Sequence, residues 1–206
     1  MPKETFFNLP ESKRTRIIDA AIDEFSKSHY SNVTIDNIVK NAEIPKGSFY
    51  QYFQNKDDLY VYLFTELGDT KIALFEQLKS EIQKISFREY MMKYIVELKK
   101  LEGSGTRMVQ LKQEFLNQCP QEIKKQILRE EMPKSIKLFD EVIDAYIKKG
   151  EFRKDLDSKS AAYVTVMSLS NLEYYPFCEE EAILAVLMNV IDFLIRGMEG
   201  NVVVDR

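Results

Sequence analysis

Cysteine and histidine are scarce in this chain of 206 residues, and their scarcity excludes several kinds of site. The two cysteines, Cys119 and Cys178, have no partner in a Cys-x-x-Cys pattern, which argues against a disulfide framework and a structural zinc site. His29 is the only histidine, so it has no second histidine with which to form a metal site or a catalytic triad. We expect His29 in a loop, with a ligand or sensor role as the weaker alternative, and a reducing cytoplasm as the location.

Long apolar segments are missing as well. The N-terminal residues MPKETFFNLPESKR lack the basic region and the following apolar region of a secretory signal. The longest nearly apolar run, 182–195, is too short for a bilayer and is interrupted by Asn189 and Asp192. It predicts a buried or interfacial helix, and we expect no membrane partner.

Signatures of catalysis are also absent. The sequence has no glycine-rich loop that would cradle a phosphate, which argues against a nucleotide-hydrolysing enzyme. The acidic run Glu179-Glu180-Glu181 stands at a predicted helix start, where negative charge favours the helix dipole. We therefore expect no enzyme activity, no metal and no cofactor.

The charge balance is slightly acidic, with a net charge of −4. Residues 1–60 carry eight Lys and Arg against nine Asp and Glu, so the N-terminal part is not basic. Any attraction to nucleic-acid phosphate must therefore come from the local placement of a few side chains. The candidates are Arg14, Arg16, Lys40, Lys46 and Lys56.

The most informative stretch is 34–59, TIDNIVKNAEIPKGSFYQYFQNKDDL, which predicts two short helices meeting at a sharp turn. In the first helix, apolar residues recur at the spacing of one helical face: Ile35, Ile38, Val39 and Ala42. Thr34, just ahead, is a suitable N-cap. Pro45 disfavours helix at Ile44 and suits a helix entrance, so we expect a break before Lys46.

The second of these helices has two different faces. At about 100° per residue, Phe49 and Phe53 share one face. The opposite face holds Gly47, Ser48 and Gln51, which are small or polar and leave it open to a partner. Two short helices joined by a tight turn form a helix-turn-helix, whose second helix can enter the DNA major groove.

The segment KGSFYQYF followed by NKDDL resembles the DNA-binding signature of the TetR/AcrR family of bacterial repressors, and the resemblance covers about residues 13–60. It implies DNA contacts from Thr34, Lys46, Gly47, Ser48, Tyr50, Gln51, Tyr52 and Lys56. Tyr50 and Lys56 match family positions that touch phosphate, and Thr34 matches one that presents its hydroxyl and helix-start N–H to phosphate. The alternatives are an ordinary solvated face and, for Lys56, a simple surface lysine.

The sequence departs from the family pattern in two places, at Glu43 and at Pro45. Glu43 stands where the turn between the helices usually has glycine, and Pro45 where it often has serine. A non-glycine residue at positive φ is strained by about 1 kcal/mol, so we expect the turn to have a different shape here. Gln51 stands where many relatives carry a bulkier or basic residue, so no relative's operator sequence transfers to this chain.

Helical periodicity dominates the rest of the chain, and strand-like alternation is nowhere sustained. Asn55 is a candidate helix cap, Ser86 and Glu89 form a capping box, and Gly150 is a helix stop. Predicted helices cover 13–25, 56–84, 86–101, 106–117, 120–131, 133–149, 158–175 and 179–198. We therefore predict an all-α protein with an N-terminal three-helix helix-turn-helix DNA-binding domain, 1–55, and a C-terminal helical-bundle ligand-binding and dimerisation domain, 56–206.

The family resemblance implies a cytoplasmic transcriptional regulator, a repressor that a small-molecule effector releases from a palindromic double-stranded DNA operator. It also implies a homodimer in which 158–175 and 179–198 of each chain pack together. The apolar stripe in the last of these segments fits that interface or an internal core equally well: Ile183, Val186, Leu187 and Val190.

An effector pocket in the larger domain is compatible with its aromatic and methionine side chains, among them Phe115, Tyr163, Met167 and Tyr174. The alternative function is a helical ligand-binding or adaptor protein that does not bind DNA.

Overall fold

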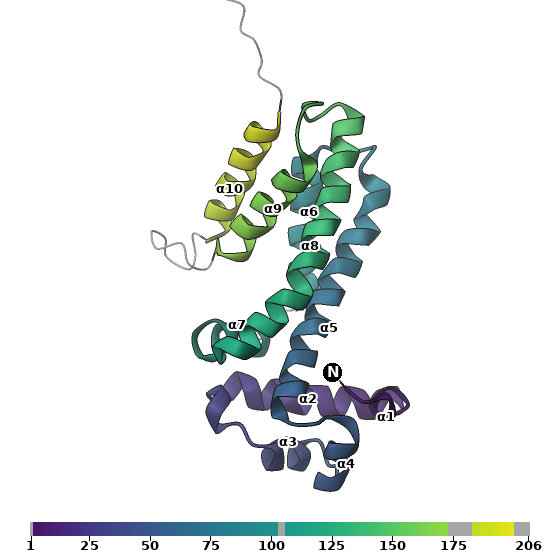
Figure 1. Cartoon of the computed structure of the whole chain (residues 1–206), viewed down its shortest axis with the longest axis vertical. Coiled ribbons are helices and arrows are strands. Elements are labelled where there is room, and N and C mark those ends of the chain that lie inside the picture. The colour runs from purple at the N-terminus through teal and green to yellow at the C-terminus, as the bar shows by residue number, and fades with distance from the viewer. Residues whose placement is uncertain (1, 103–105, 173–182, 200–206) are drawn as a thin grey trace, which may run out of the picture. The chain divides into compact units, whose positions relative to one another are not determined.

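The structure, a computed structural model, describes residues 2–102, 106–172 and 183–199. Every regular element within these ranges is a helix (Figure 1), which confirms the all-α prediction. The chain divides into two compact units, the first built from residues up to 70 with 102–131 and the second from 71–101 with the residues from 132 onward. Two long helices, α5 (Lys56–Gln77) and α8 (Gln121–Lys149), contribute to both units.

The first unit contains the predicted helix-turn-helix. Its complete helices are α1 (Glu4–Phe7), α2 (Glu11–Lys27), the 3-10 helix η1 (Tyr30–Asn32), α3 (Ile35–Asn41), α4 (Lys46–Tyr52) and α7 (Thr106–Gln118). Helix α3 packs against α4, and α2 packs against both α3 and α7 (Figure 1). The predicted three-helix arrangement of α2, α3 and α4 is therefore confirmed.

Aromatic rings make up much of the core of the first unit. Phe6 and Phe53 are fully buried, and their ring centroids lie 4.8 Å apart. Phe25 and Tyr60 form a second contact, with centroids 4.7 Å apart. Helix α1, which carries Phe6, was not predicted, because a helix of four residues contains no apolar repeat. Burial of Phe6 fixes α1 in place instead.

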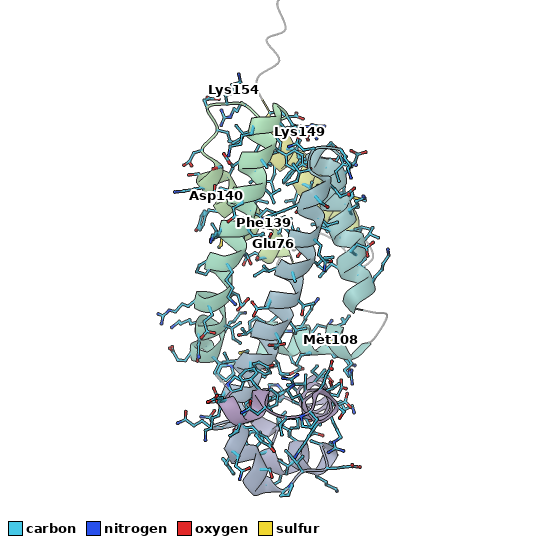
Figure 2. All side chains as sticks on the ribbon, turned by 90° about the vertical axis from the view of Figure 1, so that its right-hand side faces the viewer. Glu76, Met108, Phe139, Asp140, Lys149 and Lys154 are labelled. Carbon is cyan, nitrogen blue, oxygen red and sulfur yellow. The ribbon has the colours of Figure 1, made fainter. Side chains whose placement is uncertain are left out.

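The second unit contains η2 (Leu78–Glu81), α6 (Phe87–Glu102), α9 (Ser158–Ser170), α10 (Ile183–Met198) and the remaining parts of α5 and α8. Its core again combines aromatic and aliphatic side chains, including the fully buried Tyr90, Val142 and Tyr146. Phe139 of α8, labelled in Figure 2, has its ring centroid 4.6 Å from that of Phe75 in α5.

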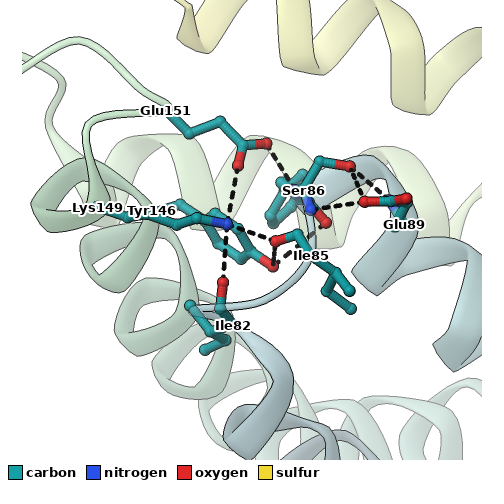
Figure 3. Close-up of polar contacts among 8 residues, drawn as sticks. Ile82, Ile85, Ser86, Glu89, Tyr146, Lys149 and Glu151 are labelled. Carbon is teal, nitrogen blue, oxygen red and sulfur yellow. Dashed lines mark hydrogen bonds and ion pairs between the residues drawn. The ribbon is translucent and has the colours of Figure 1, made fainter.

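A partly buried ammonium holds the loop between η2 and α6 (Figure 3). Lys149 Nζ donates to the carbonyls of Ile82 at 2.9 Å and Ile85 at 2.6 Å. The same atom lies 5.0 Å from the centroid of the Tyr146 ring, within range of a cation–π contact. These bonds satisfy loop carbonyls that would otherwise lose their hydrogen bonds to water.

The start of α6 confirms the predicted capping box (Figure 3). The backbone N–H of Ser86 donates to Glu89 Oε2 at 2.8 Å, and the N–H of Glu89 donates to Ser86 Oγ at 3.2 Å. The predicted stop after α8 is also present, since Gly150 has a φ of 88°, in the left-handed region that glycine tolerates.

Helix boundaries differ from the prediction in the middle of the chain. The segments 120–131 and 133–149 are one helix, α8, which continues through Pro133. A proline inside a helix costs about 3 kcal/mol. Ile127 before it and Val142 after it are both buried, and burial of apolar side chains on both sides offsets that cost. Helix α5 ends at Gln77 and is followed by η2, earlier than the predicted 84.

The last two predicted helices are present as α9 and α10, and residues 173–182 lie outside the described part of the chain. None of the helices described is long and apolar enough to cross a membrane. Within the same ranges, no cluster of three or more His, Cys, Asp or Glu residues is arranged to hold a metal ion.

Candidate nucleic-acid interface

Helix α3 begins at a cap that the sequence predicted. Thr34 Oγ1 accepts a hydrogen bond from the backbone N–H of Asn37 at 3.2 Å. Ile38 and Val39 are buried and fix the helix to the core. Thr34 itself is exposed, so its hydroxyl and the start of α3 lie at the surface, where the family resemblance places a phosphate contact.

The turn between α3 and α4 is a Schellman motif built around Glu43. The N–H of Ile44 donates to the carbonyl of Val39 at 3.0 Å, and the N–H of Glu43 donates to the carbonyl of Lys40 at 3.2 Å. This pattern places the residue after the cap in the left-handed region, and Glu43 has a φ of 52°. Glu43 therefore does not reshape the turn, contrary to the expectation. The buried neighbours Ala42 and Ile44 hold it in the conformation that favours glycine.

Helix α4 turns one face to the core and the other to solvent. Phe49 and Phe53 are fully buried, as the spacing predicted. Gly47 and Gln51 are exposed and Ser48 is half-buried. A Cβ atom added at Gly47 would meet nothing within 4 Å, so the backbone is openly accessible there. The outer face of α4 is thus polar and sterically open.

The two tyrosines of α4 lie on different faces. Tyr50 is 45% exposed, so its phenol is available at the surface. Tyr52 is 5% exposed, with its ring centroid 6.1 Å from that of Phe6. The prediction that Tyr52 faces DNA is therefore not supported, because its ring fills the core. The sequence did hold the signal, since Tyr52 follows Phe49 by one helical turn.

An ion pair joins the two helices at the surface. Lys46 Nζ lies 2.7 Å from Asp36 Oδ1 in the first turn of α3. The hydrogen bond to Asp36 raises the pKa of Lys46, so Lys46 stays charged. The pair also balances one of the few positive charges on this face. Asp36 was not singled out from the sequence, because an acidic residue at a helix start is already explained by the helix dipole.

Lys56 holds the loop that leads into α3. Its Nζ donates to the carbonyls of Tyr30 at 2.7 Å and Val33 at 3.0 Å, and it lies 4.5 Å from the centroid of the Tyr30 ring. Burial lowers the pKa of Lys56. The Tyr30 hydroxyl donates to Asp57, and burial with this bond raises the pKa of Tyr30. Lys56 is thus a structural residue, and the predicted phosphate contact would use the remaining N–H of its ammonium.

The predicted effector-pocket residues are divided between the two units of the chain. Phe115 belongs to the first unit, where its ring stacks on Phe64 with centroids 4.4 Å apart. Tyr163 and Met167 belong to α9 in the second unit, and Tyr163 is 53% exposed. Tyr174 lies outside the described residues.

Comparisons with known proteins agree with this geometry. The family model described as "Bacterial regulatory proteins, tetR family" matches residues 17–63, which include α3 and α4. A crystal structure of a TetR family transcriptional regulator from Chloroflexus aurantiacus J-10-FL is 31% identical, with 98% of this chain and 100% of that chain covered and a TM-score of 0.56.

Two further comparisons are with regulators from Bacillus subtilis. The fatty acid metabolism regulator protein of Bacillus subtilis (strain 168) is 25% identical over 193 residues, 92% of this chain and 97% of that protein. The crystal structure of the transcriptional regulator FadR from Bacillus subtilis in complex with stearoyl-CoA has a TM-score of 0.61 at 23% identity, with 90% and 99% of the two chains covered.

We predict that Glu43→Gly raises the free energy of unfolding of the first unit by about 1 kcal/mol, because glycine adopts the left-handed conformation without Cβ strain. Thermal unfolding at one protein concentration measures this. Glu43→Gly also removes the exposed ion pair between Arg16 and Glu43, which are 3.4 Å apart. Arg16→Gln removes the same pair and is the control; it should change the free energy of unfolding little. Lower stability of Glu43→Gly than of the wild type would contradict the Schellman assignment.

We predict that Lys56→Met lowers the free energy of unfolding by about 2 kcal/mol, because two loop carbonyls lose their donor. The matched control is Lys40→Met, which removes an exposed lysine from α3 and should be nearly neutral. The melting temperatures of the two variants, each compared with that of the wild type, measure this difference in stability. Equal stability of both would show that Lys56 does not hold the loop.

Proposed function

This chain belongs to the TetR family of transcriptional regulators, and from that premise we propose that it is a repressor that binds a palindromic DNA operator and is released by a small-molecule ligand. The single observation that carries the proposal is the helix-turn-helix with an open, polar outer face on α4. Such a face is what a recognition helix needs in the major groove. The site of action is the cytoplasm, where the DNA of a bacterial cell lies.

The DNA contacts follow from which side chains reach the surface. Gly47 lets the backbone of α4 approach the groove, while Ser48 and Gln51 can reach base edges. Thr34 and Tyr50 are exposed at positions suited to backbone phosphates, which would fix the register of α4 without reading sequence. Domain 1–55 would carry this role, and 56–206 would bind ligand and a second copy.

A homodimer would use the surface of α9 and α10. Tyr163 and Val164 on α9 are about half exposed, and Phe193 on α10 is 78% exposed. Apolar side chains left at the surface of two adjacent helices suit a four-helix interface with a second copy. Two recognition helices about one DNA turn apart would then select a nearly palindromic site.

The first ligand class to test is a long-chain acyl-coenzyme A. The support is that a relative matched over nearly its whole length regulates fatty acid metabolism, and that one neighbour of the same fold was solved with stearoyl-CoA. Binding releases DNA only if the ligand prefers the arrangement of the dimer that does not fit the operator.

The proposal is tested by footprinting the purified protein on the DNA upstream of its own gene and on a genomic library. A protected, nearly palindromic site is the expected result. If no site is protected even at low salt, the repressor function is refuted, and a carrier or adaptor that binds ligand without DNA becomes the better account.

We predict that Gly47→Ala weakens operator binding at least ten-fold while leaving thermal stability unchanged or slightly raised. The added methyl meets no atom of the protein and improves helix propensity, so any loss arises where the backbone meets DNA. Pro45→Ala, just outside the helix, serves as a neighbouring control for stability. If Gly47→Ala binds the operator with wild-type affinity, the backbone of α4 does not lie against the major groove at Gly47.

We predict that stearoyl-CoA raises the melting temperature and releases DNA, because a ligand that binds only the folded state stabilises it by mass action. Coenzyme A alone and free stearate are the matched controls for headgroup and chain. A rise in melting temperature without DNA release would mean that the ligand binds but does not act as an inducer.

A further inference from the structure

The end of α4 is completed by side chains from a distant part of the chain. The carbonyls in the last turn of any helix have no donor within that helix. In α4, the carbonyl of Phe49 receives the N–H of Phe53 at 2.8 Å. The next three carbonyls, those of Tyr50, Gln51 and Tyr52, are left for other donors.

Lys3 and Thr5 supply all three of these donors. Lys3 Nζ donates to the carbonyl of Tyr50 at 2.7 Å, and the backbone N–H of Lys3 donates to the carbonyl of Tyr52 at 2.8 Å. Thr5 Oγ1 donates to the carbonyl of Gln51. Two residues from a distant part of the same chain, Lys3 and Thr5, thus close the last turn of the recognition helix.

The charge of Lys3 also suits this position. Helix α4 has no basic residue in its own last turn, although the negative end of the helix dipole lies there. The ammonium of Lys3 supplies that positive charge from outside the helix. A distant segment of the same chain therefore caps the end of α4, both by hydrogen bonds and by the positive charge of Lys3.

A buried ring anchors the segment that carries the cap. Phe6 is 0% exposed, and its ring centroid lies 4.8 Å from that of Phe53 and 5.4 Å from that of Tyr62. Lys3 and Thr5 are thus tied to the core that α4 packs on. They precede residues 17–63, the part of the chain matched by the family model, so this cap is additional to the matched helix-turn-helix.

We infer that Lys3 and Thr5 are positioning residues for DNA recognition, because they hold the last turn of α4 in the place from which Tyr50 and Gln51 meet DNA. A helix of seven residues is too short to be stable by itself. Without the cap, its last turn frays, and only the ordered fraction can bind the operator in register. The inference rests on the proposed function, with α4 as the recognition helix.

The test is the double variant Lys3→Met, Thr5→Val, which keeps the shape of both side chains and removes their donors. We expect operator binding to weaken about ten-fold, with binding to random DNA unchanged, because two hydrogen bonds to one helix end are lost. Amide hydrogen exchange in 50–53 should quicken about ten-fold, with the rest of the first unit unchanged. The conservative pair Lys3→Arg, Thr5→Ser should restore both values.

Lys27→Met is the control for the loss of one positive charge, since Lys27 is exposed at the end of α2. Equal loss of affinity on all DNA, with a salt slope lower by about one, would overturn the inference and make Lys3 a phosphate contact. Unchanged exchange and unchanged operator affinity would also overturn it. Failure of the wild type to bind any DNA would refute the proposed function, while the exchange measurement would still test whether Lys3 and Thr5 hold α4.

Discussion

The candidate interface depends on how short helices satisfy their ends. A helix of seven residues leaves most of its backbone N–H and carbonyl groups without a partner inside the helix, and both α3 and α4 have this length. The chain supplies partners from outside at three of these four ends, while the start of α4 has no side-chain cap. Thr34 caps the start of α3, the Schellman turn at Glu43 closes its end, and Lys3 and Thr5 close α4. These contacts, together with the burial of Phe49 and Phe53, hold the exposed face of α4 in place.

The positive charges of this interface are a few individually positioned lysines and not a generally basic surface. Lys46 is paired with Asp36, and Lys56 is bonded to two loop carbonyls. Lys149 repeats the arrangement of Lys56 in the second unit, where it also bonds two carbonyls three residues apart and lies over a tyrosine ring. In both places an ammonium replaces the water that would otherwise solvate a loop before a helix. Affinity for phosphate must then come from exposed donors and oriented N–H groups.

Local patterns predicted most of the fold. The apolar spacing around Ile38 and Phe49 identified the two helices, and single residues identified the caps at Thr34 and Ser86. Contacts between distant segments were not predictable in this way. Nothing near Lys3 indicates that it bonds the carbonyl of Tyr50, and nothing near Asp36 indicates its pairing with Lys46. The continuation of α8 through Pro133 was missed for a related reason. The sequence shows the local cost of a proline inside a helix, but it does not show the burial of apolar side chains on both sides of Pro133 that outweighs this cost.

Regulation under the proposed function can be traced inside the first unit. Helix α7 packs along α2, where Leu111 is fully buried, and Arg107 donates to Asp23 at 3.0 Å and to Asp19 at 3.1 Å. The two aspartates are one helical turn apart, so a single guanidinium engages both. These exposed ion pairs contribute little stability, and the buried packing must carry most of the coupling. Since α2 also packs on α3, and α3 packs on α4, a ligand that displaces α7 would act on the recognition helix α4 through α2 and α3. Such a ligand needs only to prefer the displaced arrangement by more than the packing energy that the displacement costs.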